Sequence, residues 1–381
     1  MNYALVRTAE GIIVEVATRI GILTTGGDCS GLNSVIRGAY LRTRTLGYSL
    51  VGIKRGFRGL ACNDALSPDY VELNDTICDE SMLIESGSIL LSDTKWMSLE
   101  IQKGRTVEDV KKSIVNGYRK LNLDGLICVG GDGSLKLLNE LTANSDELKV
   151  VFVPKTIDND VNYTDYAVGF QTSVKVAVEA IENIRSTAKS HERTMVVEVM
   201  GRDAGFIALY AGLASGADVI LVPEFKYDLE KIKDKIRTNF QNGKNHCIIV
   251  VAESVEADDF KHSEREVNGF VKYTHISYKG IGHYISQKIR EAGFDCRSVT
   301  LGHIQRGGET CVSDRLLGTL SGVEAVNLIS NGTFGKMLAF SENRIKTMDI
   351  GEVVGNVNKT LREDDKYVHL AKDLGVYIGE I

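Results

Sequence analysis

Residues 153–161 read VPKTIDNDV, so a buried apolar run ends in a lysine, a threonine and two aspartates. In an extended segment alternate side chains point to opposite faces. We therefore expect Asp158 to accept a proton from an acceptor hydroxyl while Asp160 faces a metal ion. Thr156 and Lys155 add a hydrogen-bond donor and a positive charge for phosphoryl oxygens. The pattern predicts phosphoryl transfer to a sugar alcohol, and the simpler alternative is a turn, because Asp and Asn bond to nearby backbone.

Two glycine-rich turns follow other apolar runs and are typical of phosphate binding. They are TTGGDCSGLN at 24–33 and VGGDGS at 129–134. Glycines allow close approach of the backbone to a phosphate, and the amides that open a helix favour an anion. Asp132 suits Mg²⁺, which prefers oxygen ligands. No GxxxxGK[ST] motif occurs in the chain, and each turn taken alone remains compatible with an ordinary tight turn.

Strands and helices must bring these loops together. Short β-branched runs predict buried parallel strands at 19–25, 49–53, 124–130, 148–154, 194–200, 218–223, 246–253 and 296–302. Helical periodicity predicts helices at 107–121, 173–186, 227–243 and 280–293. This alternation is typical of the α/β class, in which ligands bind beyond the carboxyl ends of the strands. The polar stretch 253–270 is expected to be an exposed connection or a helix.

The composition indicates a globular protein of two domains. The chain has 381 residues, of which 43% are hydrophobic and 25% charged, and this length exceeds one ordinary core. A net charge of -6 gives no overall attraction to nucleic acid or anionic membranes. The seven cysteines are scattered and never spaced as CxxC, which favours reduced thiols and a cytoplasmic protein. No signal peptide or membrane span is indicated, and residues 1–18 carry no clear signal.

Five motifs occur in a fixed order along the chain, namely TTGGDCSGLN, VGGDGS, PKTIDND, VVEVMGR and TLGHIQRGG. With these motifs the chain resembles the 6-phosphofructokinase family of the A type, whose members use ATP or diphosphate. The resemblance runs from about residue 19 to the C-terminal region. It implies a glycolytic kinase that transfers a phosphoryl group from MgATP to the 1-hydroxyl of fructose 6-phosphate, giving fructose 1,6-bisphosphate. It also implies two doubly wound Rossmann-like domains with mostly parallel sheets and an active site in the cleft between them.

The resemblance assigns a role to individual residues. Asp158 matches the base, and Thr156 and Lys155 match residues near the transferring phosphoryl group. The residues expected to bind the donor are Gly27, Gly131, Asp132, Gly133, Ser134 and Lys95, and those expected to hold Mg²⁺ are Asp132 and Asp160. The residues expected to bind the sugar phosphate are Thr156, Asp158, Arg193, Met200, Gly201, Arg202, Glu253, Arg297, His303 and Arg306. The donor domain is predicted to comprise 1–169 with 305–355, and the sugar-phosphate domain 170–304 with 356–381.

Family members borrow two arginines from a neighbouring subunit, and Arg193 and Arg297 match them. The resemblance therefore implies a homodimer or a homotetramer. Each of these arginines, seen alone, would more often be a solvated surface charge, as Glu253 would be a strand-end charge and His303 a structural histidine. Their joint occurrence in matching motifs favours the functional interpretation.

Two positions bear on the donor and point in different directions. Gly133 leaves room for the nucleoside part of ATP, whereas diphosphate-using relatives commonly have Asp there. Lys155 is common in the diphosphate users. Because steric exclusion is the harder constraint, we predict ATP as the donor, with diphosphate as the alternative.

The loop SGSILLSDTKW departs from the family pattern. Leu91 stands where a glycine is expected and Thr94 near an expected arginine, and Lys95 follows. This departure keeps open a non-catalytic subunit that binds sugar phosphate or nucleotide, although the retained Asp158 speaks against it. Arg37, Arg185, Glu224, Lys244 and His246 resemble effector-site positions, but other expected basic residues are replaced, and no effector is predicted.

Overall fold

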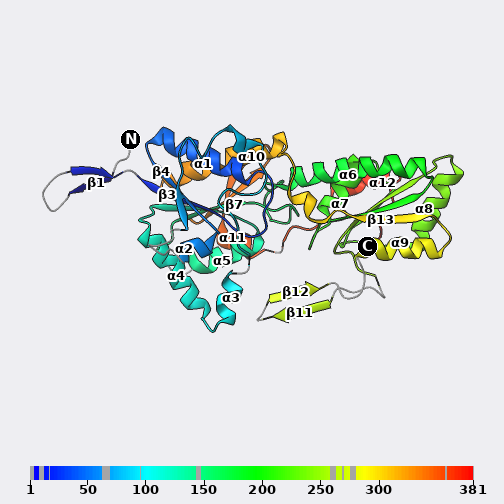
Figure 1. Ribbon diagram of the computed structural model, residues 1–381, viewed down its shortest axis with the longest axis horizontal. Helices are drawn as coiled ribbons and strands as arrows, with labels where there is room; N and C mark the ends of the chain where they lie inside the picture. Colours follow the sequence, from blue (N-terminus) through cyan, green and yellow to red (C-terminus); the bar gives the residue numbers. More distant parts are fainter. Residues whose placement is uncertain are drawn as a thin grey trace. The chain divides into compact units, whose positions relative to one another are not determined.

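The computed structural model describes residues 4–7, 13–16, 18–61, 69–94, 96–142, 147–257, 263–267, 270–274, 280–356 and 358–380. The chain divides into two compact units. The first comprises Met1–Thr156, Val161–Gly169 and Glu309–Asn358, and the second Ile157–Asp160, Phe170–Gly308 and Lys359–Ile381. Each unit contains one main sheet with helices packed on it (Figure 1).

The sheet of the first unit has the strand order β15-β14-β7-β6-β3-β4-β5. Its central strands β14, β7, β6, β3 and β4 run parallel, and the edge strands β15 and β5 are antiparallel to their neighbours. The strands are β3 Arg19–Thr24, β4 Ser49–Ile53, β5 Tyr70–Glu72, β6 Gly125–Gly130, β7 Val150–Pro154, β14 Lys336–Ser341 and β15 Arg344–Asp349. A separate antiparallel pair joins β1 Ala4–Arg7 to β2 Ile13–Val16.

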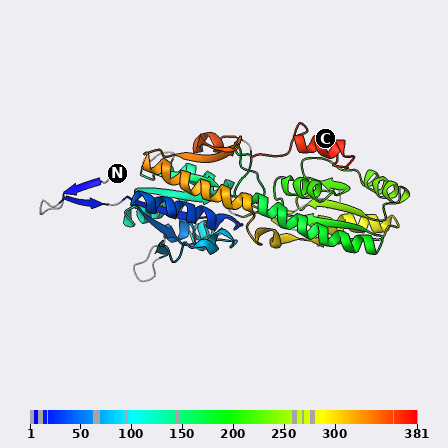
Figure 2. The same cartoon turned by 90° about the horizontal axis from the view of Figure 1, so that it is seen from above.

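Helices cover both faces of this sheet. Helices α1 and α10 lie side by side on one face, whereas α2, α4 and α5 lie on the other (Figures 1 and 2). The helices of the first unit are α1 Leu32–Leu46, α2 Phe57–Ala61, α3 Trp96–Gln102, α4 Val107–Lys120, α5 Asp132–Thr142, α10 Val312–Ser330 and α11 Ile350–Val354, with the 3₁₀ turn η1 Glu80–Leu83.

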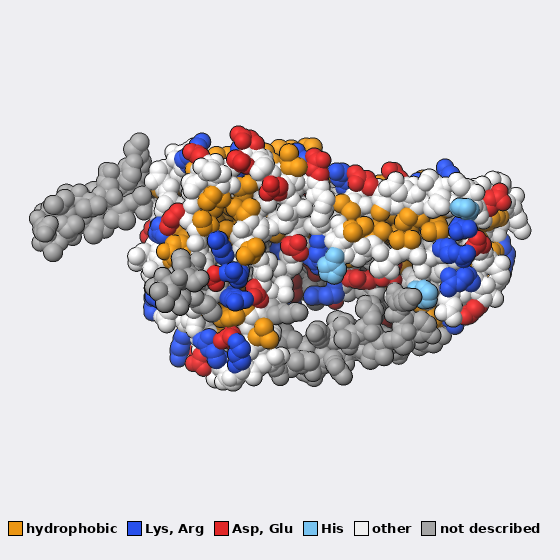
Figure 3. Space-filling model, viewed as in Figure 1, with side chains coloured by type: hydrophobic (Ala, Val, Ile, Leu, Met, Phe, Trp, Pro, Cys, Tyr) orange, Lys and Arg blue, Asp and Glu red, His pale blue; other side chains and the backbone are white. Residues whose placement is uncertain are grey.

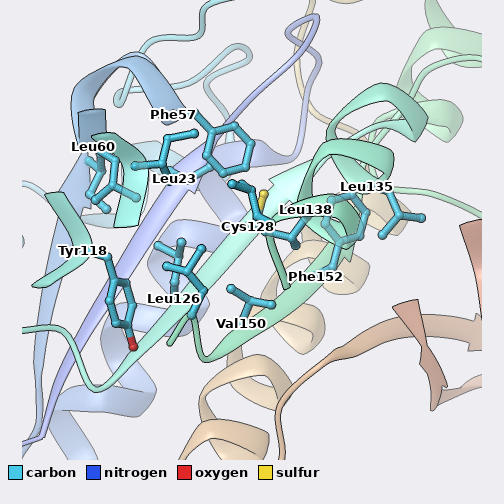
Figure 4. Close-up of a cluster of buried hydrophobic side chains, with 14 of the residues drawn as sticks. Leu23, Phe57, Leu60, Tyr118, Leu126, Cys128, Leu135, Leu138, Val150 and Phe152 are labelled. Atoms are coloured by element: carbon cyan, nitrogen blue, oxygen red, sulfur yellow. The ribbon is translucent and has the colours of Figure 1, made fainter. Parts of the chain in front are cut away.

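One hydrophobic cluster of the first unit lies between its sheet and the helices α2, α4 and α5. Figure 4 shows the labelled side chains converging on the strands β6 and β7. These side chains are Leu23, Phe57, Leu60, Tyr118, Leu126, Cys128, Leu135, Leu138, Val150 and Phe152. Phe152 is fully buried, so this close-packed layer holds the carboxyl ends of the central strands in place.

The second unit has a parallel sheet with the order β13-β8-β10-β9. Helices α6 and α7 lie on one face and α9 on the other (Figure 1). Its strands are β8 Thr194–Val199, β9 Val219–Leu221, β10 Cys247–Ala252 and β13 Cys296–Thr300, and β11 Ser263–Val267 pairs with β12 Phe270–Thr274. Its helices are α6 Phe170–Ser190, α7 Phe206–Ala214, α8 Leu229–Gln241, α9 Ile281–Glu291 and α12 Lys366–Asp373, with the 3₁₀ turn η2 Gly302–Arg306.

The helix ends follow from local sequence. Helix α4 begins with a capping box, in which the Thr106 hydroxyl accepts from the Asp109 amide at 3.1 Å and the Asp109 carboxylate accepts from the Thr106 amide at 3.1 Å. The Asp228 carboxylate caps α8 by accepting from the Glu230 amide at 2.8 Å. Helix α1 ends at Gly47, whose φ of 74° is favourable for glycine.

The predicted α/β class with mostly parallel sheets is confirmed. All eight predicted strands are present as β3, β4, β6, β7, β8, β9, β10 and β13, and all four predicted helices as α4, α6, α8 and α9. The antiparallel edge strands β5 and β15 and the strand β14 were not predicted. Within the stretch 253–270, Ser263–Val267 forms the strand β11, so a helix is excluded for these residues.

The surface carries mixed charge. Acidic and basic side chains are interspersed on the face drawn in Figure 3, in keeping with the small net charge of -6. No helix in the described part of the chain has the length and hydropathy that a membrane crossing requires.

Candidate active site

The three predicted phosphate loops of the first unit lie at one edge of its sheet. They follow β3, β6 and β7, which are parallel neighbours. Hydrogen bonds tie the loops to one another, because the Thr25 amide donates to the Val129 carbonyl at 2.9 Å and the Lys155 amide donates to the Gly130 carbonyl at 2.8 Å. The sheet therefore brings together glycine-rich turns that are about 100 residues apart in sequence.

Lys155 lies within this group of loops. Its side chain is largely enclosed, with 4% of the residue exposed, and its ammonium donates to the Gly27 carbonyl. Gly26 has a φ of 82°, and a Cβ added there would lie 3.3 Å from the Lys155 Nζ. The lysine thus fixes the shape of the first glycine-rich turn and brings a positive charge to it.

Helix α5 begins at Asp132, directly after the second glycine-rich turn. The Asp132 carboxylate accepts from the Lys136 ammonium at 2.7 Å, and its place in the first turn also favours the helix. Gly133 is exposed, and a Cβ added there would have no atom within 4 Å. The Ser134 Oγ lies 3.5 Å from the Thr25 Oγ1. These residues, which are predicted to bind the donor, therefore surround one turn with open space beside Gly133.

A pocket of about 340 Å³ opens beside the first glycine-rich turn. Its described lining consists of Gly26, Gly27, Asp28, Ser88, Leu91, Ser92 and Thr94. Thr94, which takes the place of an expected arginine, is therefore at the pocket, whereas Lys95 lies outside the described residues. Asp28, Ser88 and Ser92 were not singled out from the sequence, because serine and aspartate in loops carry no distinctive signal.

The segment after β7 bends, and the expectation that Asp158 and Asp160 alternate in an extended segment is wrong. Ile157 and Asp158 form a bend, and Asn159 has a φ of 55°. Asparagine tolerates this left-handed conformation better than most residues. Thr156 ends the first unit, and Ile157–Asp160 belongs to the second. The two carboxylates are therefore separated by a turn of the backbone rather than by the pleat of a strand.

Asp158 lies in a group of charged side chains of the second unit. Its pKa is raised to about 7, mainly because burial disfavours the charged carboxylate and next because the negative charge of Asp160 is close. Arg306 and Arg202 act in the opposite direction, and Glu253 adds to the rise. A carboxyl with a pKa near neutrality is suited to accept and release a proton at physiological pH.

These neighbours come from loops at the carboxyl ends of parallel strands. Met200, Gly201 and Arg202 follow β8, Glu253 follows β10, and His303 and Arg306 lie in η2 after β13. The Glu253 amide donates to the Val199 carbonyl at 2.9 Å, which joins the first two loops. A Cβ on Gly201, whose φ is 148°, would lie 2.7 Å from the Ala204 carbonyl oxygen, so this turn requires glycine.

Gln305 is a site residue that sequence reasoning missed. It is buried, its Oε1 accepts from the Met200 amide at 3.4 Å, and its Nε2 donates to the Gly302 carbonyl at 3.1 Å. It therefore fixes η2 against the end of β8. The sequence signal that could have identified Gln305 is its position between His303 and Arg306 in the same motif.

Arg193 and Arg297 lie elsewhere in the second unit. Arg193 precedes β8 and Arg297 is the second residue of β13, where it is paired with Met195. Both bind the Asp295 carboxylate, with N–O distances of 3.3 Å for Arg193 and 2.9 Å for Arg297. Both arginines lie at the amino ends of parallel strands, whereas Met200 and His303 follow the carboxyl ends of the same strands. The two ends of a strand of this length are about 20 Å apart.

Two of the effector-like positions, Glu224 and Lys244, have partners within the second unit. The Glu224 carboxylate accepts from the Gly205 and Leu361 amides, each at 3.0 Å, and Lys244 pairs with Asp218. Burial lowers the pKa of His246, which favours its neutral form. Glu224 and Lys244 therefore have structural contacts in this unit.

A sequence profile described as Phosphofructokinase matches residues 19–329. The chain belongs to the phosphofructokinase family. The prediction of this family from five ordered motifs, and of an enzyme within it, is confirmed.

The chain is similar over almost its whole length to curated phosphofructokinases. The ATP-dependent 6-phosphofructokinase 1 of Synechocystis sp. is 40% identical over 365 residues, covering 95% of this chain and 98% of that protein. The pyrophosphate–fructose 6-phosphate 1-phosphotransferase of Dictyoglomus thermophilum is 38% identical over 355 residues, covering 93% and 97%.

The solved structure of phosphofructokinase from Saccharomyces cerevisiae is similar to this chain, with a TM-score of 0.74 and 26% sequence identity. The similarity covers 94% of this chain and 47% of the yeast chain. Phosphofructokinases named for either donor are thus among the relatives.

Proposed function

We propose that this phosphofructokinase transfers the terminal phosphoryl group of ATP to the 1-hydroxyl of fructose 6-phosphate, giving fructose 1,6-bisphosphate. The observation that supports this most directly is the pKa of Asp158, raised to about 7 by burial and by Asp160. A general base works best when its pKa is close to the working pH. A partly buried aspartate with a raised pKa and no such task would be an unexplained destabilising group.

Asp158 acts as the base in this proposal. Its carboxylate accepts the proton of the sugar hydroxyl as the hydroxyl oxygen forms a bond to phosphorus and the bond to the departing diphosphate breaks. Arg202 and Arg306 favour the ionised carboxylate, so both forms of Asp158 are available near neutral pH. Thr156, two residues earlier in the chain, supplies a hydroxyl to the transferring group.

The residues of the second unit match the chemistry of a sugar phosphate. Arg202, Arg306 and His303 offer cationic or donor groups for a phosphate, and Glu253 offers an acceptor for sugar hydroxyls. The backbone turn at Met200 and Gly201 lies beside them and is fixed by Gln305. A combination of cations with one carboxylate suits a ligand that carries both a phosphate and hydroxyls.

The donor is proposed to bind the first unit through the turns at Gly27, Gly131, Gly133 and Ser134. Backbone amides in such turns bind phosphate oxygens. The Lys155 ammonium, which donates to the Gly27 carbonyl, adds charge to the same turn. The role of Lys95 stays a prediction.

Mg²⁺ is part of the proposal, with Asp132 and Asp160 as its holders. The described residues contain no group of three or more His, Cys, Asp or Glu that would by itself hold a metal ion. Mg²⁺ commonly binds through one or two carboxylates together with substrate phosphates. The negative charge of Asp160 raises the pKa of Asp158, and a cation beside Asp160 would offset this repulsion. When bound, the ion would neutralise phosphate charge.

Diphosphate is the second candidate donor. Lys155 and the similarity to a pyrophosphate-dependent relative favour it, whereas the open space beside Gly133 favours ATP. Comparing kcat/KM for the two donors with the same purified protein separates the candidates.

We also propose a cytoplasmic homo-oligomer in which Arg193 and Arg297 serve the site of a neighbouring subunit. Arg193 and Arg297 lie at the amino ends of β8 and β13, whereas the loops at Met200 and His303 lie at the carboxyl ends. This supports the proposal, because side chains at opposite ends of one sheet cannot contact the same ligand. Exposed Val312, Leu316 and Leu320 form an apolar stripe on α10, and such patches commonly mark protein interfaces.

A complementation experiment tests the shared site. A chain with Arg193→Ala and Arg297→Ala is mixed and reassembled with an Asp158→Asn chain. If the arginines act across subunits, a mixed dimer regains one intact site, and about one quarter of the normal activity returns. If they act within their own chain, no activity returns.

The catalytic proposal is tested by an assay for fructose 1,6-bisphosphate with Mg²⁺ and either donor. Turnover with ATP that exceeds turnover with diphosphate is expected. Absence of product with both donors, together with retained ligand binding by calorimetry, would instead identify a non-catalytic subunit.

A further inference from the structure

The pocket beside the first glycine-rich turn has one feature that phosphate binding does not explain. Of the described residues that line it, Leu91 alone has a large hydrocarbon side chain, and the others are glycine, serine, threonine and aspartate. Leu91 is 48% exposed, whereas the preceding Leu90 is fully buried. The core therefore uses Leu90, and the Leu91 side chain is left at the pocket.

Leu91 also has an unfavourable backbone conformation. Its φ is 61°, a left-handed value at which a bulky residue is an outlier and glycine is preferred. Neighbouring hydrogen bonds impose this conformation. The Leu91 amide donates to the Ser88 carbonyl at 3.0 Å, the Thr24 hydroxyl donates to the Leu91 carbonyl at 2.8 Å, and the Arg55 amide donates to the Leu90 carbonyl at 2.8 Å.

A leucine that is strained and half-exposed gains little for the fold. Such outliers persist where the surroundings over-determine them, and they concentrate at ligand sites. A phosphate offers only charged oxygens, which lose hydration beside a leucine without any compensating contact. The ribose or base of a nucleotide offers carbon surface that would cover the leucine.

From this geometry we infer that Leu91 is a specificity-determining residue, which contacts the nucleoside part of the donor and favours a nucleoside triphosphate over inorganic diphosphate. The inference rests on the proposed function, because it takes the pocket to be the donor pocket. Leu91 provides affinity for the donor and takes no part in the transfer of the proton or the phosphoryl group.

The expected effect follows from the exposed part of the side chain. Covering about half of a leucine changes an affinity by about three- to tenfold. Leu91→Ala removes this surface but leaves the alanine at the same positive φ. Leu91→Gly removes it and also relieves the backbone, so it keeps the test valid if the alanine variant does not fold.

The experiment compares donors that differ in the nucleoside. The measured quantities are KM for ATP, KM for diphosphate, and Ki for inorganic tripolyphosphate as a competitor of ATP. For both Leu91 variants we expect KM for ATP to rise about three- to tenfold, while the other two constants stay within about twofold of wild type. Leu99→Ala is the matched control, because Leu99 is 47% exposed in the same unit and does not line the pocket.

Two results would overturn the inference. One is an unchanged KM for ATP in the Leu91 variants, and the other is an equal weakening of ATP and tripolyphosphate, which would mean that Leu91 only shapes the phosphate turn. A wild-type protein that turns over diphosphate but not ATP would also overturn it. A wild-type protein that forms no fructose 1,6-bisphosphate with any donor refutes the proposed function itself, so the two failures are distinguishable.

Discussion

Replacing Asp158 by Asn should abolish most activity and at the same time stabilise the protein above neutral pH. The pKa of Asp158 is raised from 3.8 to about 7, and each tenfold change in proton affinity corresponds to about 1.4 kcal/mol. The ionised carboxylate is therefore disfavoured in the folded protein by at most about 4 kcal/mol. Water at the partly exposed carboxyl reduces this value, so we expect a gain of about 1–4 kcal/mol for the asparagine variant at pH 8.

The sign follows from linkage. Because the folded-state pKa lies above the unfolded value, the protonated carboxyl contributes its full stability below pH 3.8, and this contribution is lost as the pH rises through about 7. Asparagine imitates the protonated form at every pH. Its advantage should accordingly be greatest at pH 8 and should fall by more than half at about pH 5.

The assay combines unfolding and turnover. Thermal unfolding of the unliganded protein should show a Tm increase of at least about 3 °C for Asp158→Asn at pH 8, with a smaller increase at pH 5. The rate should fall by about 10² to 10⁴, and wild-type kcat/KM should rise with pH through about 7.

The matched control is Asp234→Asn on α8, where the carboxylate is exposed and pairs with Arg237. It should change Tm by no more than about 1 °C. A destabilised Asp158→Asn protein at pH 8, or a stabilisation that does not decrease toward pH 5, would refute the burial argument. Normal turnover in this variant would refute the role of the base.

Three further changes test other parts of the molecule. Gly133→Asp should fold normally, because no atom lies within 4 Å of the added Cβ, and should lower kcat/KM for ATP at least about tenfold relative to diphosphate through repulsion of the phosphates; equal changes for both donors would contradict it. Gly201→Ala places its Cβ 2.7 Å from the Ala204 carbonyl oxygen and should raise KM for fructose 6-phosphate while leaving KM for ATP unchanged, as steady-state kinetics would show. Phe152→Ala should destabilise the first unit by about 3–5 kcal/mol, seen as an earlier urea transition, and a loss below about 1 kcal/mol would mean that the core in Figure 4 repacks freely.

Much of the fold was predictable because buried parallel strands are recognisable in sequence. The strand Val150–Pro154 is buried at every position, and such continuous apolar runs differ clearly from loops. The strand Arg344–Asp349 was missed because it lies at a sheet edge and has no buried residue, so its residues carry no continuous apolar pattern. The strand Ser263–Val267 was missed because its composition is polar and its pairing with Phe270–Thr274 is not visible in either segment alone.

The sequence by itself determined the residue types at the site, because the motifs around Gly27, Asp132, Asp158 and Arg306 are local and their order identifies the family. Only the tertiary structure decided what surrounds each residue. The raised pKa of Asp158 arises mainly from burial and from the charge of Asp160, with a further rise from Glu253, and it is opposed by Arg306 and Arg202. Glu253, Arg202 and Arg306 are 44 to 148 residues away from Asp158 in the chain. The positive φ of Leu91 likewise occurs where Thr24 donates to the Leu91 carbonyl and Arg55 donates to the Leu90 carbonyl. These contacts with distant segments are recorded by no local pattern of residues.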